Sequence, residues 1–166
     1  MRFELVDRLG RQHATTAPAM NKIATGVEAK DFIDINALVA ENLKGIARAK
    51  KKTISEITVV VLDRPRNEQL LSDIRSAGAT VKLISDGDVA ASIEAALPEK
   101  EVDMLMGIGG TPEAVLSAAA IHCIGGNIQC VAWPRDWSER DSALAKGDSC
   151  PLLVYPDSRE GNQCAN

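Results

Sequence analysis

The sequence lacks any long apolar run and any excess of positive charge. No hydrophobic stretch approaches the roughly 20 residues that a membrane-spanning helix needs, and residues 1–7 are too charged for a secretory signal. Nineteen basic against 23 acidic side chains give a formal net charge of -4, which creates no broad cationic field for nucleic acid or anionic lipid. We therefore expect a cytoplasmic protein with no nucleic-acid or membrane partner. Any anion site in it has to be built locally.

Residues that bind zinc are also scarce. The four cysteines form no C-x-x-C pair, and only His13 and His122 could complete a site. Because structural zinc sites bring such ligands together, usually from closely spaced pairs, we expect no thiolate metal centre. Cys123 and Cys130 are instead expected to be reduced, mostly buried residues of a helix and a strand.

The sequence does contain a regular alternation of apolar β-branched runs with helical segments. Its 166 residues and 45% hydrophobic content suit one domain with a substantial core. Strands that alternate with helices are typical of a parallel-rich sheet covered on both faces, so the expected fold class is α/β. The expected strands are 58–62, 80–84, 103–106 and 127–131, and the expected helices are 36–50 (capped by Asn36), 65–77, 88–97 and 111–123.

Both ends of the chain lack this periodicity. Residues 1–16 carry no clear pattern, and residues 148–166 mix Ser, Asp, Pro, Gly and Asn. Segments of this composition are commonly irregular. The expected organisation is an irregular N-terminal segment 1–16, an α/β domain 17–147 in which 138–146 forms one more short helix, and an irregular tail 148–166.

The strand expected at 58–62 is followed by Asp63-Arg64-Pro65-Arg66. Pro65 suits the first turn of a helix, and each arginine can offer a forked pair of donors to a phosphate. Two arginines at a helix N-terminus oppose the helix dipole, which favours an anionic partner. The alternative is a structural salt bridge to Asp63.

Two further strands end in unusual sequences. Ser85-Asp86-Gly87-Asp88 fits either hydrogen bonding to sugar hydroxyls or helix capping by Asp88. The segment Gly107 to Glu113 predicts a glycine-rich turn whose backbone N–H groups could approach a phosphate, although a plain tight turn explains it equally well. It lacks the spacing of a nucleotide fingerprint, so a generic nucleotide-binding domain is the weaker interpretation. Because parallel strands place their carboxyl ends at one sheet edge, the three motifs together favour a binding site.

These motifs together resemble class II fructose-1,6-bisphosphatases. The resemblance runs from about Ala17 to Leu144 and includes Met20–Ala24 and Trp133–Arg135. It implies that the chain forms the second half of a fold similar to that of the inositol-monophosphatase-like sugar phosphatases. The segments that carry it are 58–66 (TVVVLDRPR), 74–89 (IRSAGATVKLISDGDV) and 105–113 (LMGIGGTPE).

The resemblance also implies roles for single residues. A substrate phosphate would be contacted by the arginines, sugar hydroxyls would be held by the Asp-Gly-Asp motif, and a glycine would lie against the substrate. One glutamate would bind Mn²⁺ or Mg²⁺, which prefer hard oxygen ligands. The phosphate contacts would be Arg64, Pro65 and Arg66, and the sugar-hydroxyl contacts would be Asp86, Gly87 and Asp88. The glycine against the substrate would be Gly110, and the metal ligand would be Glu113.

The implied reaction is metal-dependent hydrolysis of the 1-phosphate of fructose 1,6-bisphosphate, in gluconeogenesis, glycerol metabolism or Calvin-cycle carbon metabolism. Sedoheptulose 1,7-bisphosphate is a further possible substrate, and the full-length protein is expected to be a homo-oligomer.

The sequence departs from the family pattern in two ways. The family's acidic segments Gly-Glu-Gly-Glu and Asp-Pro-(Ile/Leu)-Glu-Gly-Thr do not occur in it, and Ala19 replaces a substrate-contacting tyrosine. No catalytic residue is therefore assigned in this chain. Two hypotheses follow: the chain is a fragment of a working bisphosphatase, or it is a phosphosugar-binding module that catalyses nothing.

Overall fold

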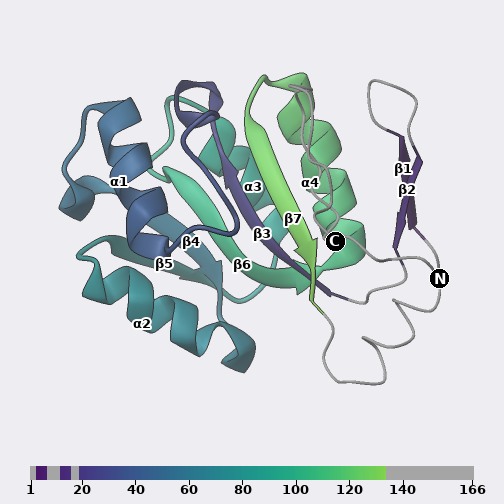
Figure 1. Cartoon of the computed structure of the whole chain (residues 1–166), viewed down its shortest axis with the longest axis horizontal. Helices are drawn as coiled ribbons and strands as arrows, with labels where there is room; N and C mark the ends of the chain where they lie inside the picture. Colours follow the sequence, from purple (N-terminus) through teal and green to yellow (C-terminus); the bar gives the residue numbers. More distant parts are fainter. Residues whose placement is uncertain (1–2, 7–11, 16–18, 134–166) are drawn as a thin grey trace, which may run out of the picture.

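A computed structural model describes residues 3–6, 12–15 and 19–133, and shows a five-stranded sheet between two pairs of helices (Figure 1). The strand order across the sheet is β5-β4-β6-β3-β7, which confirms the expected α/β class. The strands are β3 (Ala19–Thr25), β4 (Thr58–Leu62), β5 (Thr80–Ile84), β6 (Met104–Gly110) and β7 (Asn127–Ala132). The helices are η1 (Val27–Ala29), α1 (Val39–Lys50), η2 (Ile54–Glu56), η3 (Pro65–Asn67), α2 (Glu68–Ser76), α3 (Asp88–Ala96) and α4 (Thr111–Cys123).

Strand β3 gives the sheet its mixed character. It pairs antiparallel with β6 on one side and with β7 on the other, whereas β4 is parallel to both β5 and β6. The other four strands of this sheet therefore run in one direction, and β3 begins at the edge where they end. The sequence pattern did not predict β3 because Asn21, Lys22 and Thr25 interrupt its apolar residues.

Each face of the sheet carries its own core. Successive side chains of a strand point to opposite faces, so Val59 and Val61 face α1 and α2 while Val60 faces α3 and α4. All three valines are fully buried. Full burial of one such side chain contributes about 1.5 to 3 kcal/mol to folding. The faces of α3 and α4 that pack on the sheet carry mainly alanine, which lets these helices lie close to the strands. These alanines are Ala91, Ala95, Ala96, Ala114 and Ala118.

Two predicted helix starts differ from the structure. Helix α1 begins at Val39 after the extended Leu38, whose N–H donates to Glu41 Oε2 at 3.2 Å. Asn36 is therefore not its cap as predicted, and its N–H instead donates to Asp34 Oδ1 at 2.9 Å. The helix expected from Pro65 opens with the 3-10 turn η3 before α2.

The predicted glycine-rich turn is wrong, because β6 continues through Gly110. Gly107 to Gly110 lie opposite Lys22 to Ala19 in the β3 register, so the antiparallel partner keeps this segment extended. The chain bends only where α4 starts at Thr111. Gly107 to Gly110 therefore belong to the strand and do not form the predicted turn.

Residues 1–16 are not wholly irregular as expected. Strands β1 (Phe3–Val6) and β2 (Gln12–Thr15) form a separate antiparallel pair. The predicted helix 138–146 and tail 148–166 lie outside the described residues. Within the described part of the chain, none of the helices has the length and apolar content to cross a membrane.

Candidate functional site

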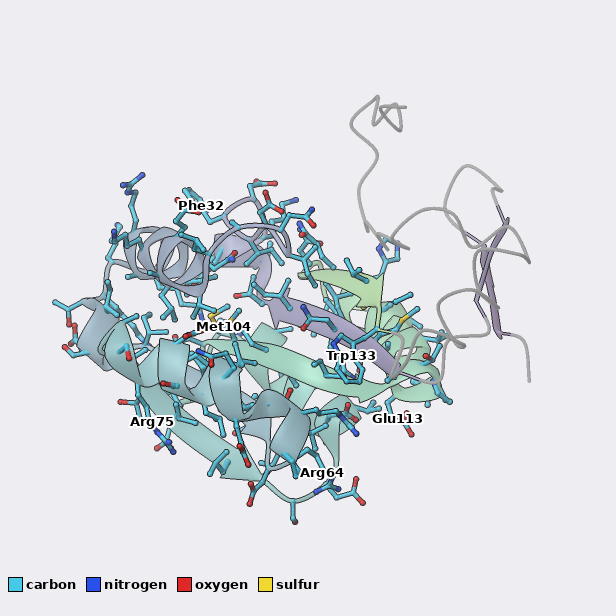
Figure 2. The ribbon with its side chains drawn as sticks, turned by 60° about the horizontal axis from the view of Figure 1, so that its bottom comes forward. Phe32, Arg64, Arg75, Met104, Glu113 and Trp133 are labelled. Atoms are coloured by element: carbon cyan, nitrogen blue, oxygen red, sulfur yellow. The ribbon has the colours of Figure 1, made fainter. Side chains whose placement is uncertain are left out.

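The three motifs singled out in the sequence meet at one edge of the sheet. Strands β4, β5 and β6 are parallel, so their carboxyl ends deliver Arg64, Asp86 and Gly110 to the same edge. The end of β7 joins them, because the N–H of Trp133 donates to the carbonyl of Ala19 at 3.0 Å. Figure 2 shows Arg64, Glu113 and Trp133 toward this end, with Arg75 away from it. The expected convergence of the motifs is confirmed.

Arg66 is fixed to this edge through one nitrogen of its guanidinium. Its Nε donates to the carbonyl of Ile108 on β6 at 3.0 Å. The remaining guanidinium nitrogens have no partner among the residues that the structure describes, and the side chain is exposed. Arg66 therefore presents a forked pair of donors to solvent from an oriented side chain, as recognition of a phosphate requires.

Arg64 is held differently. Its Nη1 donates to the backbone carbonyl of Asp63 at 2.8 Å, and neither arginine forms an ion pair with the Asp63 carboxylate within residues 19–133. The alternative interpretation of the motif as a salt bridge to Asp63 is therefore not supported. Among the described residues, no carboxylate forms an ion pair with either arginine.

Asn67 fastens the loop after β4 to β6, and sequence reasoning missed it. Its side chain is fully buried. Nδ2 donates to the Leu62 carbonyl at 2.9 Å, and Oδ1 accepts the N–H of Ile108 at 2.9 Å. Asn67 thus holds the same residue of β6 whose carbonyl orients Arg66. The only signal in the sequence was a polar residue directly after the Arg-Pro-Arg motif.

The loop after β5 places two acids in different surroundings. Gly87 adopts a φ of 85°, a conformation that favours glycine, and is the N-cap of α3. Asp86 is exposed, and its Oδ1 accepts the N–H of Gly87 at 2.7 Å. Asp88 is the first helical residue and not the cap, so the capping interpretation of Asp88 is wrong. Its side chain points inward and is buried.

The partner of Asp88 is Lys22, which the sequence analysis did not single out. Lys22 Nζ pairs with Asp88 Oδ2, and the two residues are only 1% and 4% exposed. Gly109 lies beside the pair: a Cβ added there would lie 2.8 Å from Lys22 Nζ and would overlap Asp88 Oδ2. The glycine is required because backbone and ion pair share this space. The signal that could have revealed it was a single lysine with the apolar residues Met20 and Ile23 close by in the sequence.

Cys130 lies opposite Lys22 in the register of β3 and β7. Burial raises the pKa of the Cys130 thiol to about 12, and the nearby Lys22 ammonium opposes this only in part. The thiol is therefore protonated and unreactive, as its structural interpretation predicted. Cys123 is exposed, so the expectation that it is mostly buried was wrong.

Gly110 and Glu113 form a second close contact at the edge. A Cβ added to Gly110 would overlap Glu113 Oε2, which shows that the carboxylate lies directly over the glycine. Glu113 is half-buried in the first turn of α4, where the helix dipole favours a negative charge. The carboxylate has no partner in the described part of the chain, so it can offer oxygen to a hard cation.

The described residues do not assemble a complete metal site. No group of three or more His, Cys, Asp or Glu side chains among them is arranged to hold a metal ion. Asp88 is already paired with Lys22, and Glu113 is the carboxylate that the family resemblance assigns to a metal. Mn²⁺ and Mg²⁺ need several oxygen ligands, so residues 19–133 by themselves do not fit such an ion.

Comparison with known proteins agrees with the motifs. Residues 10–153 match the model of the family described as bacterial fructose-1,6-bisphosphatase, glpX-encoded. Proteins named D-fructose 1,6-bisphosphatase class 2/sedoheptulose 1,7-bisphosphatase from Trichodesmium erythraeum, Microcystis aeruginosa and Crocosphaera subtropica are 50%, 49% and 48% identical over 110 residues. This segment covers 66% of the chain and 32% of each relative, so the chain spans about a third of their length. The chain belongs to the glpX-encoded family of bacterial fructose-1,6-bisphosphatases.

Proposed function

We propose that this chain provides the sugar-phosphate-binding part of a sugar bisphosphatase that hydrolyses the 1-phosphate of fructose 1,6-bisphosphate. The observation that carries the proposal is Arg66, whose Nε is fixed on Ile108 while its other nitrogens face solvent. The relatives' names support fructose and sedoheptulose bisphosphates as the substrate class. The intact protein would act in cytoplasmic carbohydrate metabolism, including gluconeogenesis, glycerol metabolism or the Calvin cycle, as a homo-oligomer.

Each group at the edge has a role in this proposal. Arg66 donates to a phosphate of the substrate, and Arg64 with Pro65 borders the same phosphate. Asp86 and Asp88, on either side of Gly87, accept hydrogen bonds from sugar hydroxyls. Gly110, which lacks a side chain, lets the substrate approach the backbone.

A divalent ion would supply Lewis-acid stabilisation of the phosphoryl oxygens in the intact enzyme. Of the described residues, Glu113 is the one we assign to it, as a single oxygen ligand. The other ligands of a complete Mn²⁺ or Mg²⁺ site would come from outside residues 19–133. This chain's own contribution is therefore to bind and orient the phosphosugar.

Calorimetry with Arg66→Ala tests the proposal. The unchanged chain is expected to bind fructose 6-phosphate and fructose 1,6-bisphosphate. Removing a charged hydrogen-bond donor should weaken that binding by roughly 1.5 to 3 kcal/mol. Arg75→Ala is the matched control, because Arg75 is an exposed residue of α2 away from the edge (Figure 2). Equal affinity of the two variants would remove Arg66 from the site.

A non-catalytic phosphosugar-binding module is the second candidate function. The absence of a three-residue metal cluster among the described residues favours it, because binding needs no metal whereas hydrolysis in this family does. Phosphate release from fructose 1,6-bisphosphate by the purified chain with Mn²⁺ would exclude the module. Binding without release would support it. A nucleotide-binding function has lost its main support, since Gly107 to Gly110 are strand residues.

A further inference from the structure

We propose that Lys22 is a positioning residue that holds one oxygen of Asp88 so that the other oxygen faces a sugar hydroxyl. Lys22 would thereby set the selectivity of the edge for a phosphosugar over free phosphate. The inference rests on the proposed phosphosugar function and adds to it a residue that touches no substrate.

The first support is the bonding of Asp88. Its Oδ2 is bound by Lys22 Nζ, while its Oδ1 has no hydrogen-bond partner among the residues that the structure describes. The side chain is nevertheless only 6% exposed. Oδ1 is not among the fully buried side-chain atoms that lack a partner, and a carboxylate oxygen with spare acceptor capacity can take a hydrogen bond from a sugar hydroxyl.

The second support is the location of the lysine. Lys22 lies in the middle of β3, which is hydrogen-bonded on both sides by β6 and β7. Asp88 lies instead at the start of α3, directly after the exposed Asp86 and Gly87. The ion pair therefore fastens a helix start at the ligand edge to a strand that is paired on both sides. The Ser92 hydroxyl also donates to the Asp88 carbonyl at 2.6 Å, which further fixes the helix start.

The third support is energetic. Taking two opposite charges out of water costs about as much as their attraction returns, and an apolar pair of similar volume often gives an equally stable fold. Lys22 and Asp88 lie among apolar neighbours such as Met20 and Ala91, where an apolar pair could be buried. Stability alone therefore does not account for the pair.

The test compares two ligands in the same variants. Dissociation constants for fructose 6-phosphate and for inorganic phosphate are measured on the unchanged chain, on Lys22→Met and on Lys22→Gln. We expect both variants to bind fructose 6-phosphate at least tenfold more weakly, and phosphate within about threefold, because the phosphate is held by Arg66. Lys82→Met, which removes an exposed lysine paired with Glu94, is the control and should alter neither constant.

The outcomes separate the inference from the function on which it rests. If the unchanged chain binds no phosphosugar, the proposed function and the inference fail together. If it binds but the Lys22 variants keep the same ratio of the two constants, only the inference fails. A parallel loss for both ligands, together with a lower melting temperature, would show a merely structural role.

A second measurement avoids substitution, in case neither variant folds. In the unchanged chain labelled with carbon-13, the carboxyl resonance of Asp88 should shift when fructose 6-phosphate binds and stay in place when phosphate binds. A resonance that moves equally with both ligands, or with neither, would overturn the positioning role.

Discussion

Arg66 and Ile108 are 42 residues apart in the sequence, yet the guanidinium Nε of one donates to the carbonyl of the other at 3.0 Å. This bond links the loop after β4 to the end of β6, and it aims the free end of the guanidinium at the sheet edge. Neighbouring Asn67 bonds the N–H of the same Ile108. Two adjacent residues therefore hold both polar backbone groups of one strand residue.

Asn67→Ala should destabilise the fold and weaken phosphosugar binding together. The substitution leaves the partly buried Leu62 carbonyl and Ile108 N–H without their partners, and each such loss costs roughly 1 to 3 kcal/mol. Urea unfolding is expected to show a loss of about 2 to 4 kcal/mol. Asn36→Ala, at an exposed residue, should change stability by no more than about 0.5 kcal/mol. A change in Asn67→Ala as small as that of the control would contradict the bridging role.

The neighbouring glycines of β6 should respond differently to alanine. Gly109→Ala places a methyl group against the buried Lys22–Asp88 pair and should cost about 1 to 3 kcal/mol or more, as overpacking does. Gly110→Ala meets only the movable carboxylate of Glu113, so stability should fall by less than about 1 kcal/mol. Thermal unfolding of the two variants measures the contrast. Equal destabilisation would show that the ion pair can move aside.

Asp103 should make the fold sensitive to acid. Burial alone would raise the pKa of its carboxyl, but hydrogen bonds from Lys52 at 2.7 Å, the N–H of Thr58 at 2.9 Å and Lys50 together hold that pKa below the ordinary 3.8. Because the Asp103 carboxyl has a lower pKa in the folded state than in the unfolded state, it stabilises the fold at pH values above its unfolded-state pKa. This contribution is lost as the pH falls through the folded-state pKa. Stability should therefore decline from about pH 4 downward.

Asp103→Asn isolates this contribution. The variant should be less stable at neutral pH by roughly 1.5 to 3 kcal/mol, because it loses charged hydrogen bonds. Its stability should also fall less steeply below pH 4 than that of the unchanged chain. Denaturant unfolding at a series of pH values measures both effects. Parallel pH profiles for the two proteins would assign the acid sensitivity to other carboxylates.

The two described cysteines should differ in reactivity. Cys123 is exposed, whereas the Cys130 thiol is buried and has a pKa of about 12, so only Cys123 should react with a thiol reagent in the native state. The measurement uses a chain with Cys150→Ser and Cys164→Ser, and peptide mapping identifies the labelled residue. Cys130 should become labelled only in denaturant. Rapid native labelling of Cys130 would mean that the sheet edge formed by β7 opens readily.

Much of the alternating part of the fold could be predicted from local pattern. The bounds of β4, β5 and α4 agree with the expected 58–62, 80–84 and 111–123. This agreement arises because a short β-branched run favours a strand and an alanine-rich segment favours a helix whatever the rest of the chain does. The direction of parallel strands then placed the motifs at 64–66, 86–88 and 110–113 at one edge. The roles of these residues toward a ligand remain predictions.

What the sequence by itself determined was the α/β class, the family and the three motifs that gather at the edge. Only the tertiary structure decided that β3 enters the sheet antiparallel, that Gly107 to Gly110 are strand and that Lys22 meets Asp88. These features depend on pairing between segments that lie far apart in the chain. Lys22 and Asp88 are 66 residues apart. Local periodicity shows where a strand or a helix forms, but it does not show which distant residue will pack against it.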